Sequence, residues 1–390
     1  MRRHIHRDFP PDMIPYGRQS VDQDDIDAVI EVLKSDWITT GPKIPEFEEA
    51  LKKYTGTGNA VVVNSGTSAL DISVQALDLP KGSEVITTPF TFAATVNALL
   101  YNDIMPVFAD IEPETRNIDP DEIRRKITDR TRAIICVDFA GHPCDYSILR
   151  DIAGEYGLFL IEDACHALGA EYRNKKIGSL ADMTIFSFHP VKHITTGEGG
   201  AVTLEKPEWY SKLQLLRNHG IDRDARSRYG PESSWAYDMK YLGRNYRMTD
   251  FQAALGISQL RKIDSFVRRR NEIAERYRQL LSSIPGISLP EVQPHVRHAW
   301  HLYTILLDYP ANRQKFFMFM KEGGIGVNVH YIPVYHHSYY QEQFRFRPED
   351  FPVTEDIFRR IVTLPLYPAM TDDDVDTVVR RIQKFFRKRG

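Results

Sequence analysis

Short apolar runs alternate with amphipathic stretches between residues 58 and 205, and this alternation limits the possible folds more than any other feature. Continuous apolar runs of this length are typical of strands that are buried on both faces, and the amphipathic stretches between them are typical of crossover helices. The predicted strands are Ala60–Val63, Glu84–Thr87, Met105–Ala109, Ala133–Val137, Leu158–Glu162, Met183–Phe188 and Ala201–Leu204, with helices at Ser68–Leu77 and Phe92–Leu100. The pattern predicts an α/β fold with a mostly parallel sheet between helices.

The remainder of the chain has a different pattern. A long helical region is expected over Thr249–Arg278, and we interpret its arginine-rich stretch 268–272 as a solvated face. Strands are expected at His301–Leu307 and Ile325–His330, and a closing helix at Asp372–Lys388.

These elements predict two domains. We expect a large α/β domain over residues 25–262 and a small C-terminal α+β domain over residues 263–390. Residues 1–24 are a candidate to pack with the small domain.

Composition narrows the classes of partner. The formal charge of -3 gives no field that would gather nucleic acid or a membrane surface. We find neither an apolar run of about 20 residues nor the apolar stretch of a signal peptide. Because the three cysteines are an odd number and two of them lie in or just after apolar runs, we expect reduced thiols and a cytoplasmic protein.

Asp163 and Lys192 are the most informative candidates for a functional site. Asp163 follows the apolar strand 158–162, at the carboxyl end where open α/β sheets bind ligands. Lys192 follows another apolar run and precedes the glycine-rich segment 196–200, so its amine is expected to be partly desolvated. An amine for a Schiff base and a carboxylate for a pyridine nitrogen are what pyridoxal 5'-phosphate requires, although Asp163 alone would more often be a helix cap.

An anion site is predicted at residues 64–70, where a strand turns into a helix. Backbone N–H groups and the helix dipole there favour a phosphate, with Ser187 as a further hydroxyl donor. The competing interpretation is a simple N-cap by serine or threonine. His166 is a candidate donor to the cofactor's ring oxygen, although a lone histidine is more often only a satisfied polar residue.

Several motifs together resemble the sugar aminotransferases of the DegT family, which are fold-type I pyridoxal phosphate enzymes. The similar segments occur in order and are Asn64–Leu70, Thr88–Phe92, Glu162–Ala167, Ser187–His189 with Lys192, and Gly243–Asp250. The resemblance runs from about residue 14 to the C-terminus.

The resemblance implies a role for each matching residue. Lys192 would form the Schiff base, Asp163 would bind the pyridine nitrogen and His166 would lie near the ring oxygen. Phe92 would stack on the ring, with Gly66, Thr67 and Ser187 around the phosphate. Asn245 would reach the phosphate in the partner subunit's site, so a homodimer is expected. Dehydratases of this family carry histidine at the lysine position, and the presence of Lys192 therefore favours transamination.

The resemblance also suggests a substrate. Segments 298–302, 326–333 and 364–368 are similar to those of members that aminate UDP-linked 4-keto sugars, first in the pseudaminic acid pathway and next toward UDP-4-amino-4-deoxy-L-arabinose. L-Glutamate is the implied donor. The candidates for substrate contacts are Thr40, His330, Tyr331 and Arg247, with Arg217, His219 and Arg244 as further candidates for a diphosphate or carboxylate. A packed core explains the aromatic residues about as well.

Three other classes remain as alternatives. A nicotinamide oxidoreductase is disfavoured because no Gly-x-Gly-x-x-Gly follows a predicted strand. A regulatory protein that binds pyridoxal phosphate without turnover would keep the same cofactor residues. A metal hydrolase is disfavoured because the 13 histidines show no His-Glu-x-x-His spacing, and no metal is expected.

Overall fold

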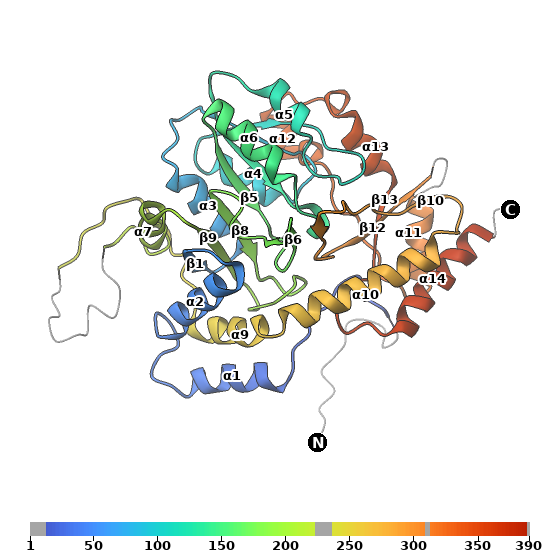
Figure 1. Ribbon diagram of the computed structural model, residues 1–390, viewed down its shortest axis with the longest axis horizontal. Helices are drawn as coiled ribbons and strands as arrows, with labels where there is room; N and C mark the ends of the chain where they lie inside the picture. The colour runs from blue at the N-terminus through green and yellow to red at the C-terminus, as the bar shows by residue number, and fades with distance from the viewer. Residues whose placement is uncertain (1–12, 223–235, 309–312, 388–390) are drawn as a thin grey trace.

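The computed structural model describes residues 13–222, 236–308 and 313–387, and a seven-stranded sheet forms its centre (Figure 1). The strand order is β1-β9-β8-β5-β4-β2-β3. Its strands are β1 (Asn59–Val63), β2 (Glu84–Thr87), β3 (Met105–Phe108), β4 (Thr131–Val137), β5 (Phe159–Asp163), β8 (Met183–Ser187) and β9 (Gly200–Leu204). This arrangement confirms the predicted α/β class.

Alternate residues along each strand pack into two different clusters. Val61, Ile161 and Ile185 face one layer of helices, whereas Val62, Leu160 and Phe186 face the other. The first layer contains α3 (Gly66–Ala76), α4 (Ala93–Leu100) and α7 (Pro207–Leu216). The second contains α2 (Lys43–Thr55), α5 (Pro120–Lys126), α6 (Tyr146–Tyr156) and α9 (Asp250–Leu260), with α1 (Gln23–Leu33) packed on α9. Both faces of the sheet are therefore buried, as its continuous apolar strands require.

One strand departs from the parallel pattern. β9 is antiparallel to both of its neighbours, β1 and β8. The connection from β8 to β9 spans residues 188–199 and contains Pro190 and two glycines, so it turns back without a crossover helix.

A second sheet has the order β10-β12-β13 and is antiparallel. Its strands are β10 (Ile287–Ser288), β12 (Tyr303–Leu307) and β13 (Ile361–Leu364). In a third small sheet, β6 (Glu171–Tyr172) lies between β11 (Val296–Arg297) and β7 (Lys175–Lys176). The remaining helices are α10 (Ile263–Leu281), α11 (Arg313–Glu322), α12 (Ser338–Gln343), α13 (Pro352–Arg360) and α14 (Asp372–Arg387). The apolar sides of α10, α11 and α14 pack against β12 and β13.

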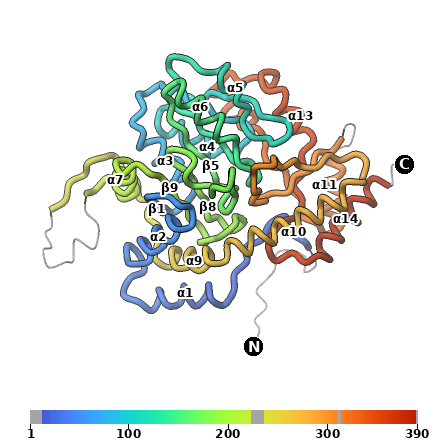
Figure 2. The backbone as a smooth tube through the Cα atoms, in the orientation of Figure 1, coloured from blue at the N-terminus to red at the C-terminus, as the bar shows by residue number. Residues whose placement is uncertain are grey.

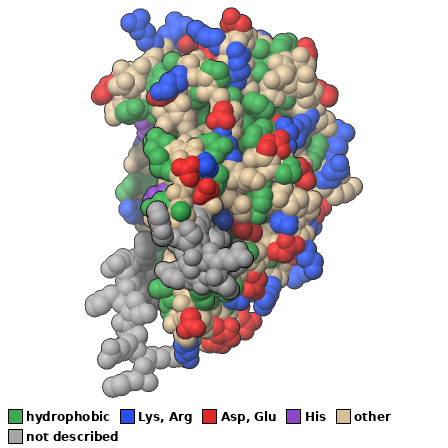
Figure 3. Space-filling view, turned by 90° about the vertical axis from the view of Figure 1, so that its left-hand side faces the viewer, with side chains coloured by type: hydrophobic (Ala, Val, Ile, Leu, Met, Phe, Trp, Pro, Cys, Tyr) green, Lys and Arg blue, Asp and Glu red, His purple; other side chains and the backbone are tan. Residues whose placement is uncertain are grey.

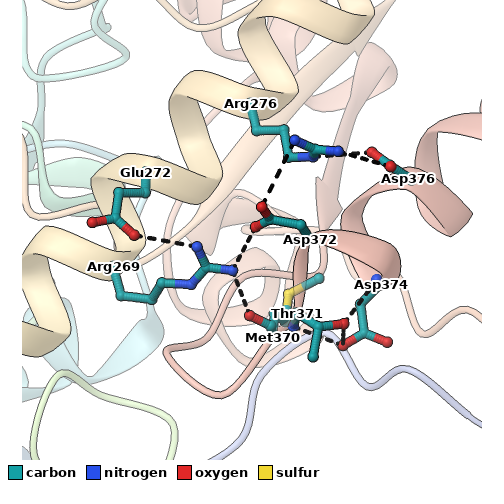
Figure 4. A network of polar contacts seen from close by, with 8 residues as sticks. All are labelled: Arg269, Glu272, Arg276, Met370, Thr371, Asp372, Asp374 and Asp376. Carbon is teal, nitrogen blue, oxygen red and sulfur yellow. Dashed lines mark hydrogen bonds and ion pairs between the residues drawn. The ribbon is translucent and has the colours of Figure 1, made fainter.

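Helix α10 links the two parts of the molecule. It continues from the direction of α9 beside the large sheet and ends against α14 (Figure 2). An ion-pair network joins α10 to α14: Arg276 forms two hydrogen bonds to Asp376, at 3.0 and 2.7 Å, and Arg269 donates to Asp372 at 2.8 Å (Figure 4). These contacts hold α14, which packs on the small sheet, against α10.

The structure corrects the sequence expectations for this region in three respects. The helical region 249–278 is two helices, α9 and α10, interrupted at Arg261 and Lys262. Segment 325–330 forms isolated bridges at Ile325 and Asn328 instead of a strand. Arg270 is buried, not solvated, because its guanidinium lies among backbone carbonyls.

Residues near the N-terminus pack on the C-terminal part of the chain. The N–H of Ile14 donates to the carbonyl of Gly324 at 2.9 Å, and the N–H of Leu366 donates to the carbonyl of Tyr16 at 3.1 Å. The domain boundary near residue 262 stays a prediction.

The surface carries mixed charges. Basic, acidic and apolar side chains are interspersed over the face in Figure 3. None of the helices in the described ranges has the length and apolar character needed to cross a bilayer.

Candidate active site

The candidate site is a cavity of about 510 Å³ at the carboxyl ends of the parallel strands. The residues that line it include Asp163, His166, Lys192, Gly66 and Thr67. Phe92, Ser187, His330 and Tyr331 line the same cavity. These nine predicted residues, which lie far apart in the sequence, are thus brought together.

Asp163 is the last residue of β5, and its carboxylate is fixed on both sides. Its Oδ2 accepts a hydrogen bond from the Thr95 hydroxyl at 2.7 Å, and its Oδ1 accepts from the Cys165 N–H at 3.2 Å. Thr95 in turn lies 2.8 Å from the Thr91 hydroxyl. Because the side chain is only 5% exposed and remains on the cavity wall, a bound ring would meet an oriented carboxylate.

Lys192 lies in the β8–β9 connection, on the same cavity. Its N–H donates to the carbonyl of His189 at 2.9 Å, which turns the segment back toward β9. Burial lowers the pKa of the Lys192 amine, and nearby Cys165 and Asp163 oppose this effect. A larger neutral fraction makes the amine a better nucleophile and a better proton acceptor.

The N-terminus of α3 forms another part of the cavity wall. The Ser65 hydroxyl caps this helix by accepting from the Ser68 N–H at 3.0 Å, so the N-cap interpretation is correct for Ser65. Gly66 and Thr67 nevertheless line the cavity beside Ser187. A Cβ on Gly66 would lie 3.0 Å from the Cβ of Ser187 and 3.3 Å from the Cys165 sulfur, so a side chain at this position would crowd the turn.

His166 and Tyr331 form one side of the site. The Nε2 atom of His166 and the Tyr331 hydroxyl are hydrogen-bonded at 2.9 Å, and the two rings stack with centroids 5.8 Å apart. Burial lowers the pKa of His166 well below its ordinary value, with Lys192 adding to the effect. Phe92 lies at the rim with 61% of its surface exposed, 6.0 Å from the Tyr331 ring.

These residues fit pyridoxal phosphate. The cavity combines an oriented carboxylate, a partly buried amine, a helix N-terminus with hydroxyls, and an exposed aromatic face. The buried Nδ1 atom of His166 has no partner among the described residues, so a donor or acceptor of the site is still available. By contrast, the described residues contain no group of three or more His, Cys, Asp or Glu placed to hold a metal ion.

The remaining substrate candidates do not lie in this cavity. Thr40 and Arg247 line a second cavity of about 480 Å³ between α2 and α7. Arg217 lies there too, paired with Glu48, and Arg244 pairs with Asp71 at 3.4 Å.

Asn245 lines neither cavity and is exposed. Its carbonyl accepts a hydrogen bond from the Asn64 side chain at 3.4 Å, so it lies beside the segment that leads into α3.

The sequence did not single out Thr95 or His301. Thr95 is the one hydroxyl residue of the otherwise mostly apolar helix α4, and that contrast was an available signal. His301 lines the cavity with its ring centroid 4.4 Å from that of His166, a contact between segments that no local pattern indicates.

Comparisons with known proteins agree with this geometry. Residues 19–383 match the DegT/DnrJ/EryC1/StrS aminotransferase family. Over 374 residues the chain is 47% identical to the uncharacterized protein MJ1066 of Methanocaldococcus jannaschii, covering 95% of this chain and 97% of that one. It is 41% identical to the spore coat polysaccharide biosynthesis protein SpsC of Bacillus subtilis, covering 95% and 96%.

Two solved structures share the fold over nearly the whole chain. The putative sugar aminotransferase Spr1654 of Streptococcus pneumoniae, in its PMP form, superposes with a TM-score of 0.91 at 31% identity, covering 96% of this chain and 99% of that one. PseC of Helicobacter pylori, an aminotransferase involved in the biosynthesis of pseudoaminic acid, superposes with a TM-score of 0.89 at 34% identity, covering 96% and 100%.

Proposed function

Because the chain belongs to the DegT/DnrJ/EryC1/StrS aminotransferase family, we propose that it aminates the 4-keto group of a UDP-linked 4-keto-6-deoxy sugar, with L-glutamate as donor. The enzyme is a sugar aminotransferase that depends on pyridoxal 5'-phosphate. The observation that carries the proposal is the presence of Lys192, Asp163 and the α3 N-terminus around one cavity.

The similarity to PseC supports a sugar of the pseudaminic acid type. One observation favours a second candidate: the chain is 41% identical to SpsC and 34% identical to PseC. A related nucleotide keto sugar for another surface polysaccharide, including the precursor of UDP-4-amino-4-deoxy-L-arabinose, is therefore the alternative substrate.

Each residue of the cavity has a proposed task. The cofactor, when bound, delocalises the electron pair left on the substrate carbon. Asp163, oriented by Thr95, would accept from the ring N–H, and Gly66, Thr67 and Ser187 would bind the phosphate.

Lys192 would hold the cofactor covalently and, once released, would move a proton at the substrate carbon. His166 would face the ring oxygen while its bond to Tyr331 fixes its orientation.

Replacing Lys192 tests the proposed chemistry. We expect Lys192→Ala to lower glutamate-dependent turnover by a factor of about 10² to 10⁴ or more, because a held general acid-base group contributes that much. Lys175→Ala, which removes an exposed lysine of β7, should leave turnover unchanged. Formation of 2-oxoglutarate measures both. Full turnover in Lys192→Ala would contradict the assignment.

The sugar is tested separately. The enzyme is incubated with pyridoxal phosphate, glutamate and a panel of UDP-linked 4-keto sugars, and the product is identified by mass and NMR. Amination of a 4-keto-6-deoxy sugar at C4 supports the proposal, whereas amination only of the arabinose precursor supports the alternative. If glutamate converts the bound cofactor but every sugar fails, the substrate class is wrong.

A further inference from the structure

Arg270 is a buried arginine that pairs with no carboxylate in the described part of the chain. It lies on α10, is 1% exposed, and takes part in none of the ion pairs formed by the described residues. Its Nη1 donates to the carbonyls of Trp300 and Leu366, both at 3.1 Å, and more weakly to that of His301 at 3.4 Å. Burial lowers its pKa to about 9. A buried cation bonded only to carbonyls is costly, so a role beyond simple packing is expected.

Two of the three carbonyls that Arg270 binds belong to segment 298–301, and further hydrogen bonds hold the other residues of this segment. The Asn271 side chain donates to the carbonyl of His298 at 3.0 Å, and His193 Nε2 is hydrogen-bonded to the carbonyl of Ala299 at 3.1 Å. Trp300 has a φ of +49°, a conformation that a bulky residue adopts only when its surroundings impose it. Two neighbouring α10 side chains and the residue after Lys192 therefore hold this segment in a strained form.

The same segment carries His301 into the cofactor cavity. The His301 ring lies with its centroid 4.4 Å from that of His166 and 5.7 Å from that of His193. Gly141 is close to both backbones, since a Cβ there would lie 2.7 Å from the His166 carbonyl and 3.0 Å from the Trp300 nitrogen. His301, which precedes β12 of the small sheet, thus packs its ring against the ring of His166.

We propose that Arg270 and His301 are positioning residues of the cofactor site: Arg270 fixes the backbone of segment 298–301, and the His301 ring holds His166 in its hydrogen bond to Tyr331. The inference rests on the pyridoxal phosphate site proposed above and is independent of which sugar is bound. Arg270 and His301 would affect the cofactor indirectly, through the packing and orientation of His166.

Electrostatics supports the same arrangement. Lys192, His166, His193 and Arg270 are the titratable groups that act on His301, and together with burial they lower its pKa well below the ordinary value. Burial and these neighbouring groups therefore favour the neutral form of His301. A neutral ring is a suitable support behind His166, because a second cation beside Lys192 would be repelled.

The test measures the cofactor's dissociation constant and the pH titration of its absorbance in the resting enzyme. We expect Arg270→Met and His301→Ala each to weaken cofactor binding by a factor of about ten or more, as is usual when a group that orients a ligand's contact is removed. His301→Phe keeps a ring of similar shape and should recover most of the affinity. Arg268→Met, a change of an exposed arginine on the same helix, is the matched control and should bind as the wild type does.

A double-mutant cycle separates positioning from a general loss of stability. Tyr331→Phe removes the hydrogen bond to His166 directly, so His301→Ala should add little to it and should shift the absorbance titration in the same direction. Additive effects, or wild-type cofactor binding in both Arg270→Met and His301→Ala, would overturn the proposal. If Arg270→Met fails to fold, the His301 variants decide the matter alone. Failure of the wild-type protein to bind pyridoxal phosphate would instead refute the proposed function.

Discussion

Glu162 and Asp163 are neighbours on β5, yet they have opposite environments. Asp163 faces the cofactor cavity, and Glu162 points to the other face of the sheet, where it meets Asp138 and Tyr146. The Tyr146 hydroxyl lies 2.7 Å from Asp138 Oδ1 and 2.6 Å from Glu162 Oε1, but it has only one proton to donate. One of the two carboxyl groups must therefore be protonated to complete the network.

This buried pair makes folding depend on pH. Burial raises the pKa of Asp138 to about 7 and raises that of Glu162 well above its ordinary value. The folded state then holds more protons than the unfolded state, whose aspartate titrates near 3.9. Stability from this pair is greatest below that pH and is lost as the pH rises through about 7.

We expect Asp138→Asn to flatten this dependence. The amide oxygen can still accept from the Cys144 N–H and the Tyr146 hydroxyl, and the amide nitrogen can donate toward Glu162. As the pH rises from 5 to 8, the free energy of unfolding of the variant should increase by roughly 1–3 kcal/mol relative to that of the wild type. Denaturant unfolding at the two pH values measures the change, and Asp151→Asn on the exposed side of α6 is the control. A wild-type pH slope in Asp138→Asn would show that this carboxyl does not titrate.

The sequence predicted functional residues where they lie next to a recognisable local pattern. Asp163 and Lys192 were found because each follows an apolar run that predicts a buried strand. Arg270 was missed because its partners are backbone carbonyls at residues 300, 301 and 366. No property of the sequence around an arginine indicates that distant carbonyls will surround it.

At the scale of elements, the same limit explains the broken helix. The residues between α9 and α10 include neither glycine nor proline, so the break had no local signal. Lys262 at the break is bound instead by Asp22 and Asp25, at 2.8 and 2.7 Å, where α1 begins. The parallel strands were predictable because burial on both faces requires apolar residues throughout, whereas this break depends on a contact between distant segments.

The packing of α9 gives a prediction for a single methyl group. Gly256 lies where α9 crosses α2, and a Cβ there would lie 2.5 Å from Phe47 Cζ and 2.9 Å from Thr196 Cγ2. Although alanine favours helix, we expect Gly256→Ala to destabilise the protein by about 1–3 kcal/mol through overpacking. Gly154→Ala in α6 is the matched control, because no atom of the described residues lies within 4 Å of its added Cβ. It should stabilise by about 0.5–1 kcal/mol. Equal effects of the two changes on the melting temperature would contradict this account of α9.

At the scale of the whole molecule, the cofactor site draws on both parts of the chain. Asp163 comes from the large sheet and Lys192 from its β8–β9 connection, whereas Tyr331 and His301 come from segments beside the small sheet. Asn245 is the proposed phosphate residue that remains outside, exposed on the surface. If it serves a second copy of this chain, each site of the proposed homodimer is complete only across the interface.

Mixed dimers test this last proposal. A dimer purified through two different tags, with Lys192→Ala in one subunit and Asn245→Ala in the other, would contain one intact site and one site with both defects. It should therefore have about half of the wild-type activity, well above either parent. The reciprocal control pairs a wild-type subunit with a Lys192→Ala/Asn245→Ala subunit, and if Asn245 acts across the interface neither site of that dimer is intact. Turnover per dimer measures both. High activity in the reciprocal control and none gained in the first mixture would place Asn245 in its own subunit's site, and failure to recover any doubly tagged dimer would argue against the shared site itself.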